Sequence, residues 1–312
     1  MKTSGNQRIQ MRFIDEATIT KVLSMRDLIP AMRQTMIDFS RGRIEQPPRR
    51  MSTVQPHRGF FGSMPAASAH ALGAKLVTFY PNNAKKNLPT VMAAIVLFRP
   101  ETGEPLVTLD GRLITEMRTA AVTAAYIDAV AAPDVKVLAV LGAGAQGRRH
   151  IEALSHVRKF EEIRIWSRTP QRAEQLAAEV GGKAMSREQA VRGADVVVVA
   201  TSATEPVLEG QWLRPGAKVA SVGWAGADSA EVDAATISHV VIVDSREGTL
   251  AESGNIRQFN AQIYAELGEV LDGTRPVNPD ATVIFDSIGM ACEDIAAAML
   301  VYEKLQAASK SA

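Results

Sequence analysis

A glycine motif between two apolar segments constrains the fold of this chain more than any other feature. Gly142, Gly144 and Gly147 follow the apolar run 135–141 and precede a helical pattern that continues to about residue 157. A strand, a glycine turn and a helix in this order are typical of a Rossmann βαβ unit. Such a turn binds a dinucleotide pyrophosphate, because the helix N-terminus offers free N–H groups and a partial positive charge. A purely structural turn is the alternative, and the context favours the dinucleotide.

Each glycine has its own expected role in this motif. Gly142 permits the tight turn, and Gly144 lets the backbone approach the pyrophosphate. Gly147 allows the helix to pack closely on the strand.

The end of the second strand of this unit indicates which nicotinamide cofactor fits. The strand covers residues 162–166 and is followed by Ser167, Arg168 and Thr169, without the acidic residue that usually binds the ribose of NAD. Arg168 can pair with a 2′-phosphate, and its neighbours and Arg172 can add donors. The alternative is a surface arginine beside a helix N-cap at Thr169, and both can hold at once. We therefore favour NADPH, with NADH as the second candidate.

The arrangement of predicted elements divides the chain into two domains. After residue 135, strands alternate with helices, which predicts a doubly wound parallel sheet of the α/β class. The expected strands are 135–141, 162–166, 196–201, 218–222, 240–244 and 282–285. Earlier, a helical region over 14–45 precedes β-like runs at 74–80 and 91–98 and an Ala-rich helix over 118–132. We expect an α+β substrate-binding domain over 1–125, a Rossmann domain over 126–289, and a C-terminal helix within 290–312 that returns to the first domain.

Composition excludes several classes of function. The 312 residues include 35 Lys+Arg and 34 Asp+Glu, so the net charge of +1 argues against a nucleic-acid partner. The single Cys292 cannot form an intrachain disulfide, and no Cys/His cluster has the spacing of a metal site. The five histidines form no constellation, and we expect packing or surface roles for His150 and His156. Neither a G-x-S-x-G nor an H-E-x-x-H motif is present, so hydrolytic and zinc chemistry have no support.

We also expect a cytoplasmic protein. The polar stretch 1–13 lacks the apolar core of a secretory signal. The longest apolar runs, such as 91–98, are far shorter than the roughly 20 residues that span a bilayer. No membrane partner is therefore predicted.

The first domain carries cations in unusual positions. Lys75 lies inside an apolar strand with apolar neighbours on both sides, and a buried lysine is rare unless it is paired or functional. Arg118 is expected to open the Ala-rich helix near the domain junction, and Arg49 or Arg50 follows two prolines. Together they can hold a substrate carboxylate and polarise a neighbouring C=N or C=O group. A solvated surface cation is the alternative for each, more so for Arg50 than for Lys75.

These motifs together resemble the ornithine cyclodeaminase/μ-crystallin family along nearly the whole chain, and most of all its μ-crystallin (ketimine reductase) branch. The matching stretches are 46–49, 58–65, 75–80, 118–122, 141–144, 165–169, 203–206, 252–254, 265–270 and 287–291. The resemblance implies a Rossmann domain and a substrate domain that forms a homodimer by joining strands with a second subunit.

The resemblance also implies site residues. Substrate-carboxylate contacts correspond to Arg49, Lys75 and Arg118, and Ser287 matches a residue near the substrate and the nicotinamide. The implied cofactor contacts, with the glycine motif and Arg172 added, are Thr90, Val91, Arg118, Gly142, Ala143, Gly144, Ala145, Gln146, Gly147, Ser167, Arg168, Thr169, Arg172, Thr201 and Val222.

One departure from the family pattern concerns cyclodeaminase activity. The family's cyclodeaminases carry a catalytic Asp at the position of Ala225, and the nearby Asp228 is displaced by three residues. Alanine cannot act as the base that cyclodeamination needs, which disfavours that activity. The neighbouring Trp224 either narrows the pocket or stacks on a cyclic substrate, with a core tryptophan as the alternative.

We therefore expect an NAD(P)H-dependent reductase of cyclic imino acids, such as Δ1-pyrroline-2-carboxylate or Δ1-piperideine-2-carboxylate, that forms proline or pipecolate. The expected catalytic residues are Lys75 and Arg118. Lys75 holds the carboxylate or supplies the proton, and both roles stay open. An amino-acid or N-substituted amino-acid (opine-like) dehydrogenase is a second interpretation. A third is an NADPH-containing small-molecule binding protein of μ-crystallin type.

Overall fold

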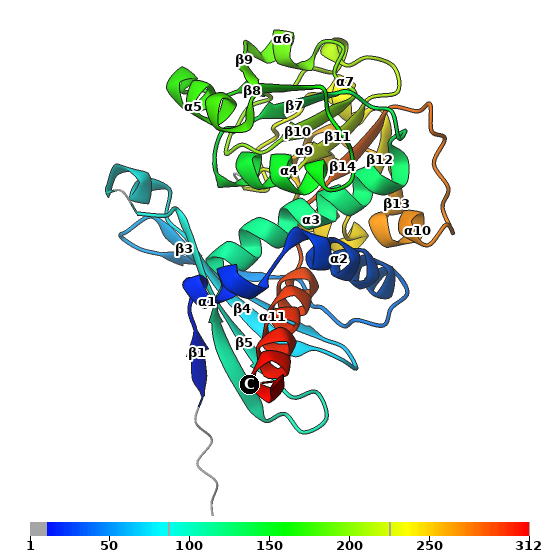
Figure 1. The fold of residues 1–312 in the computed structure, drawn as a ribbon. Coiled ribbons are helices and arrows are strands. Elements are labelled where there is room, and N and C mark those ends of the chain that lie inside the picture. The colour runs from blue at the N-terminus through cyan, green and yellow to red at the C-terminus, as the bar shows by residue number, and fades with distance from the viewer. Residues whose placement is uncertain (1–10, 87, 225, 312) are drawn as a thin grey trace, which may run out of the picture.

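The computed structural model describes residues 11–86, 88–224 and 226–311, which form two sheets joined by a long helix (Figure 1). The first sheet has six strands in the order β1-β6-β5-β4-β3-β2, antiparallel except where β1 pairs with β6. Its strands are β1 (Arg12–Ile14), β2 (Arg50–Val54), β3 (Gly59–Ala67), β4 (Leu72–Phe79), β5 (Val91–Phe98) and β6 (Pro105–Asp110).

The second sheet has eight parallel strands in the order β13-β12-β14-β11-β10-β7-β8-β9. Its strands are β7 (Val137–Leu141), β8 (Glu162–Trp166), β9 (Lys183–Ala184), β10 (Val196–Val199), β11 (Lys218–Ser221), β12 (Val240–Val243), β13 (Ile263–Glu266) and β14 (Val283–Asp286). The predicted doubly wound parallel sheet is therefore confirmed. The strand order reverses between β7 and β10, and such a switch point creates the crevice in which open α/β sheets bind ligands.

Helices cover both faces of the parallel sheet. They are α4 (Ala145–Ser155), α5 (Pro170–Val180), α6 (Arg187–Val191), η2 (Gly210–Trp212), α7 (Ala234–Ile237), α8 (Arg246–Glu252), α9 (Gly254–Phe259) and α10 (Leu267–Leu271). The boundaries of α5 follow from its sequence, because Pro170 suits a first helical position and Gly181 adopts the left-handed conformation with φ 68° just after the last turn.

The helices of the first half are α1 (Glu16–Val22), α2 (Met25–Ser40), η1 (Pro81–Lys86), α3 (Arg112–Val130) and α11 (Ala291–Ser311). The helical region expected over 14–45 is divided in two, because Ser24 accepts a hydrogen bond from Asp27 N and so caps a new helix. The C-terminal helix α11 packs against α2, α3 and strands β3, β4 and β5 of the first sheet.

Helix α3 lies between the two sheets (Figure 1). Most of its residues between Leu113 and Val130 are buried, and its alanines let neighbouring elements approach closely. The prediction that Arg118 opens this helix is wrong. The helix begins at Arg112, so Arg118 lies in its second turn, in the buried part.

One hydrophobic core runs from the first sheet through α3 to the parallel sheet. Ile95, Ile127 and Phe285 belong to the same buried cluster, although they come from β5, α3 and β14. A second cluster covers the opposite face of the parallel sheet. In the described part of the chain, no helix is long and apolar enough to cross a membrane.

Candidate active site

The glycine turn lies at the carboxyl end of β7, beside the end of β10. Gly142 has φ 125°, and a Cβ there would overlap the carbonyl oxygen of Ala200. A Cβ on Gly147 would overlap the carbonyl oxygen of Gly142, so only glycine lets α4 begin so close to the strand. By contrast, a Cβ on Gly144 would meet no atom within 4 Å. The turn therefore presents open backbone at the start of α4, and this shape fits a dinucleotide pyrophosphate.

The predicted 2′-phosphate residues lie together where β8 ends. Arg168, Thr169 and Arg172 are exposed. Thr169 is the N-cap residue of α5, but its side chain makes no capping bond. Its backbone N–H instead donates to Ser167 Oγ at 3.3 Å. Among the described residues no acid pairs with the exposed Arg168 guanidinium, so its donors are free for a ligand.

On the inner side of α4, His150 connects this helix to α3. His150 Nδ1 donates to Gln146 O at 2.7 Å, so Nε2 accepts from Thr123 Oγ1 at 3.0 Å. Burial lowers the pKa of His150 to about 4, which keeps the ring neutral. The expected packing role of His150 thus agrees with its position, and His156 is exposed.

The ends of β10 and β11 are joined by a buried acid, Glu231. Its carboxylate accepts from Thr201 N at 3.1 Å and Oγ1 at 2.8 Å, and from Ser221 Oγ and Gly223 N at 2.7 Å. Burial raises the pKa of Glu231 to about 7 against these bonds. Thr201 and Val222, two expected cofactor contacts, are therefore held at one edge of the sheet.

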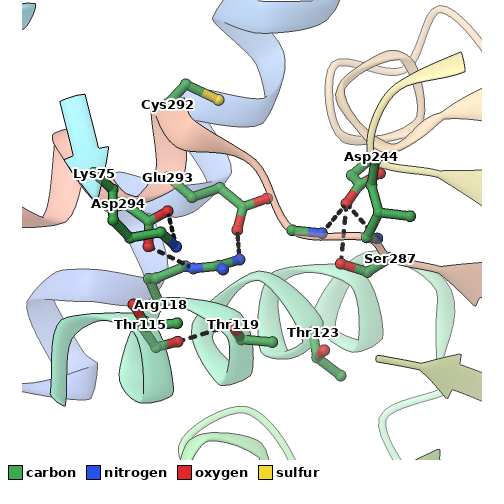
Figure 2. A network of polar contacts seen from close by, with 12 residues as sticks. Lys75, Thr115, Arg118, Thr119, Thr123, Asp244, Ser287, Cys292, Glu293 and Asp294 are labelled. Carbon is green, nitrogen blue, oxygen red and sulfur yellow. Dashed lines mark hydrogen bonds and ion pairs between the residues drawn. The ribbon is translucent and has the colours of Figure 1, made fainter. Parts of the chain in front are cut away.

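A buried network of charges lies beside this edge (Figure 2). Lys75 from β4 is 2% exposed and Arg118 from α3 is 5% exposed. Lys75 Nζ forms an ion pair with Asp294, whose other oxygen accepts from Arg118 Nε at 2.9 Å. Arg118 also pairs with Glu293 through one terminal nitrogen. Two adjacent acids at the start of α11 thus hold both cations.

Arg49 lies next to this network. Its Nη2 donates to the carbonyl oxygens of Ile288 and Gly289, both at 2.7 Å, and its Nε lies 2.5 Å from Glu252 Oε2. Arg50 is exposed on β2 instead. Of the two arginines proposed after the prolines, the structure brings Arg49 to the site.

Burial shifts the pKa values of the network in opposite directions. It lowers the pKa of Lys75 to about 8, against the attraction of Asp294. It raises the pKa of Glu293 to about 7, against the attraction of Arg118. Arg118 keeps its charge because the two acids outweigh the desolvation of its guanidinium and raise its pKa. Burial therefore moves the pKa values of Lys75 and Glu293 toward neutral pH from opposite sides.

Trp224 connects this edge to the first sheet. Its indole meets the edge of Phe79, with ring centroids 6.1 Å apart and an interplanar angle of 76°. Phe79 pairs with Val91 across β4 and β5, and Thr90 precedes Val91. The start of β5 is therefore brought toward the end of β11. The Ala225 position of the cyclodeaminase comparison lies outside the described residues.

Comparison with known proteins agrees with this geometry. A family model described as "Ornithine cyclodeaminase/mu-crystallin family" matches residues 10–309. The chain belongs to this family.

Three proteins illustrate how similar this chain is to its relatives. Ketimine reductase mu-crystallin of Mus musculus is 43% identical over 285 residues, covering 88% of this chain and 91% of the relative. The structure of Thermococcus litoralis Δ(1)-pyrroline-2-carboxylate reductase in complex with NADH and L-proline is 33% identical with a TM-score of 0.90, covering 96% of this chain and 98% of that chain. An archaeal alanine dehydrogenase dimer with bound NAD is 25% identical with a TM-score of 0.90, covering 96% and 97% of the two chains.

Acidic residues that no motif had indicated also lie at this site. Four buried or half-buried acids accompany the three cations, namely Asp244, Glu252, Glu293 and Asp294. One signal pointed to two of them, because Glu293 and Asp294 interrupt an apolar helix as Lys75 interrupts an apolar strand. Within residues 11–86, 88–224 and 226–311, no group of three or more His, Cys, Asp or Glu side chains is arranged to hold a metal ion.

Proposed function

We propose that this chain is an NAD(P)H-dependent reductase of cyclic imino acids, with Δ1-pyrroline-2-carboxylate and Δ1-piperideine-2-carboxylate as substrates. The observation that carries the proposal is the buried Lys75–Asp294–Arg118–Glu293 network at the carboxyl edge of a Rossmann sheet. The 43% identity with a ketimine reductase supports the same chemistry.

The substrate carboxylate docks on Arg49 and Arg118. After its bonds to Glu293 and Asp294, Arg118 still has donor hydrogens on its terminal nitrogens. Arg49 likewise uses one terminal nitrogen for the 287–289 turn. Charge-assisted bonds of this kind hold a planar carboxylate in one orientation. The orientation of the C=N bond follows from that anchor and from Trp224 at the side of the pocket.

The proton for the imine nitrogen comes from Lys75 in this proposal. The lowered pKa of Lys75 makes proton release easier, and Asp294 stabilises the ammonium until it transfers the proton. A contact between Lys75 and the substrate carboxylate is the other role open to it. When bound, a reduced nicotinamide supplies the hydride that the C=N carbon accepts. Catalysis then depends on orientation and electrostatics.

The cofactor in this proposal is NADPH, with NADH as the alternative. The unpaired Arg168 at the end of β8 supports the phosphate-bearing form, because no acid occupies that position. The residues proposed to hold the cofactor are Thr90, Val91, Arg118, Gly142, Ala143, Gly144, Ala145, Gln146, Gly147, Ser167, Arg168, Thr169, Arg172, Thr201 and Val222. Arg168→Ala should weaken NADPH binding by about 10- to 100-fold, the loss of a charge-assisted bond, and change NADH affinity little. If Arg168→Ala changed the affinities for NADPH and NADH equally, the proposed preference for NADPH would be contradicted.

The decisive experiment follows loss of NADPH or NADH absorbance with a panel of substrates. We expect oxidation of NADPH or NADH with the two cyclic imino acids, and no release of ammonia from ornithine plus NAD. If the protein binds the cofactor but oxidises it with none of these substrates, the result would favour a small-molecule binding protein over a reductase.

A second candidate is an amino-acid dehydrogenase that forms its imine from a keto acid and an amine. The likeness to an alanine dehydrogenase favours it. Turnover restricted to pyruvate plus ammonia or methylamine would decide for this function.

We also propose that the chain forms a homodimer through the outer face of the first sheet. Phe61, Leu76 and Met92 are 39%, 37% and 39% exposed in the single chain. Phe61 and Met92 both pair with Thr78, two residues from Leu76, so the three side chains lie on one face. An exposed apolar sheet face is typical of an interface.

A further inference from the structure

Asp244, just after β12, is a fully buried acid without a place in the reaction described above. Its Oδ2 accepts three hydrogen bonds from the turn that follows β14: from Ser287 Oγ at 3.0 Å, Ile288 N at 2.9 Å and Gly289 N at 2.8 Å. Figure 2 shows these bonds converging on one oxygen. A single carboxylate thus fixes the backbone of residues 287–289.

The same turn touches both arginines of the substrate site. Its carbonyl oxygens at Ile288 and Gly289 accept from Arg49 at 2.7 Å. Gly289 has φ 71°, and a Cβ there would lie 2.7 Å from both terminal nitrogens of Arg118. The 287–289 turn is therefore in contact with the guanidinium groups of both Arg49 and Arg118.

The other oxygen of Asp244 is also occupied. Oδ1 accepts from Ser245 N at 2.9 Å and from Thr249 Oγ1 at 3.3 Å. Each oxygen therefore faces at least one backbone N–H, which can only donate. An amide in this place would turn its NH2 group toward a backbone N–H in either orientation. The site thus specifies a carboxylate and not merely a polar group.

We propose that Asp244 is a positioning residue for the substrate carboxylate: it fixes the 287–289 turn, and the turn sets the places of Arg49 and Arg118. The inference rests on the proposed function only in requiring a substrate that carries a carboxylate. It predicts that Asp244 affects recognition of the carboxylate much more than cofactor binding, because Arg118 is only one of the residues proposed to hold the cofactor.

The test compares two imines that differ in the carboxylate alone, Δ1-pyrroline-2-carboxylate and Δ1-pyrroline. In Asp244→Asn we expect KM for the first to rise about 10- to 100-fold, as for loss of charge-assisted bonds, while kcat changes less. KM for Δ1-pyrroline should stay within about twofold. A measurement independent of turnover is calorimetric binding of pyrrole-2-carboxylate, which should weaken by a similar factor. NADPH affinity should change much less, because the glycine motif and Arg168 are not in contact with the 287–289 turn.

Two further variants make the test specific. Asp233→Asn is the matched control, because Asp233 also accepts backbone and hydroxyl bonds, from Gly210 N, Thr236 N and Thr236 Oγ1, but away from the site. It should leave both KM values unchanged. Gly289→Ala probes the second link directly, since its Cβ would displace Arg118. It should reproduce the rise in KM, and it serves alone if Asp244→Asn does not fold.

Several results would overturn the inference. One is an equal rise in KM for both imines, which would indicate a general loss of structure. Another is NADPH binding that weakens by the same factor as pyrrole-2-carboxylate binding. The proposed function fails separately, if the wild-type protein binds pyrrole-2-carboxylate but reduces neither imine. In that case the binding measurements on the variants still decide the role of Asp244.

Discussion

Lys75 and Asp294 illustrate how single residues depend on one another in the interior of this protein. Both side chains are buried, and Asp294 is 0% exposed. Removing one partner of a buried ion pair costs about 3–5 kcal/mol, because the remaining charge is uncompensated, whereas replacing both partners costs much less. Arg118 lessens the loss here, since it also bonds to Asp294.

Because the two charges depend on each other, a single and a double variant can distinguish the effect of Lys75 on stability from its proposed effect on catalysis. Lys75→Met should lower the free energy of unfolding by about 3 kcal/mol and remove most turnover. Lys75→Met combined with Asp294→Asn should recover much of the unfolding free energy but none of the turnover. Denaturant unfolding and steady-state kinetics measure the two quantities, with NADPH affinity as the control. Arg118→Leu should likewise reduce turnover strongly. Wild-type rates in these variants would disprove the assignment of the pocket.

Glu293 leads to a prediction about pH. Its pKa is raised to about 7 in the folded protein, from 4.5 for an ordinary glutamate, so the folded state binds the proton more tightly. Its contribution to stability is therefore complete below about pH 4.5 and is lost as pH rises toward 7. Glu293→Gln should become more stable relative to wild type across that window, as thermal unfolding at several pH values would show. A constant difference would mean that Glu293 is ionised throughout.

The cations of the site were predictable from the sequence, but most of their partners were not. Lys75 is conspicuous because it interrupts an apolar strand, and Arg118 begins a stretch that matches the family. The acid that joins them lies 176 positions from Arg118 along the chain. Nothing local in the sequence connects two such segments. The role of Asp244 was equally unpredictable, because an acid after a buried strand is common at any sheet edge.

Two glycines in the turn between β7 and α4 have different expected roles, one in cofactor binding and one also in folding. A Cβ on Gly147 would overlap a backbone carbonyl, whereas one on Gly144 would meet nothing within 4 Å. Gly147→Ala should therefore lower the melting temperature as well as NADPH affinity. Gly144→Ala should leave the melting temperature unchanged and weaken NADPH binding, because the methyl group enters the space of the pyrophosphate. Fluorescence titration with thermal unfolding distinguishes the two outcomes. Unchanged NADPH affinity in Gly144→Ala would place the pyrophosphate elsewhere.

The elements that the sequence predicted are the regular ones. Strand β8 is predicted with the observed bounds, and the other apolar runs of the parallel sheet lie within a few residues of theirs. Strand β3 was not predicted, because Gly59, Gly62 and Pro65 interrupt its pattern. Strands β1 and β9, of three and two residues, are too short to show a period. Pairing with neighbouring strands, and not the local sequence pattern, determines that these segments form strands.

At the scale of the whole molecule, the outer face of the first sheet yields a test of the dimer. Leu76→Lys places a charge in the middle of the apolar patch formed with Phe61 and Met92. It should convert a dimer to monomers in sedimentation experiments without reducing the helix content seen by circular dichroism. A wild-type protein that sediments as a monomer would refute the interface, and a variant that remains dimeric would place it on another surface.

The continuous core explains why the two halves act as one unit. Tyr126 on α3 donates to Val283 O at 3.0 Å and packs on Phe285, with ring centroids 5.2 Å apart. The same helix carries Arg118 toward β4. One buried helix therefore contacts the parallel sheet and also positions a residue that we propose for substrate binding.

The position of α11 has a consequence for biosynthesis. A ribosome releases the chain in order, so every strand of both sheets leaves the exit tunnel before Glu293 and Asp294. Until then, Lys75 and Arg118 have no acids to neutralise them, and the face of the first sheet that α11 covers stays open to water. A truncated chain that ends at residue 290 therefore contains every strand of both sheets, but it lacks the two acids that pair with Lys75 and Arg118.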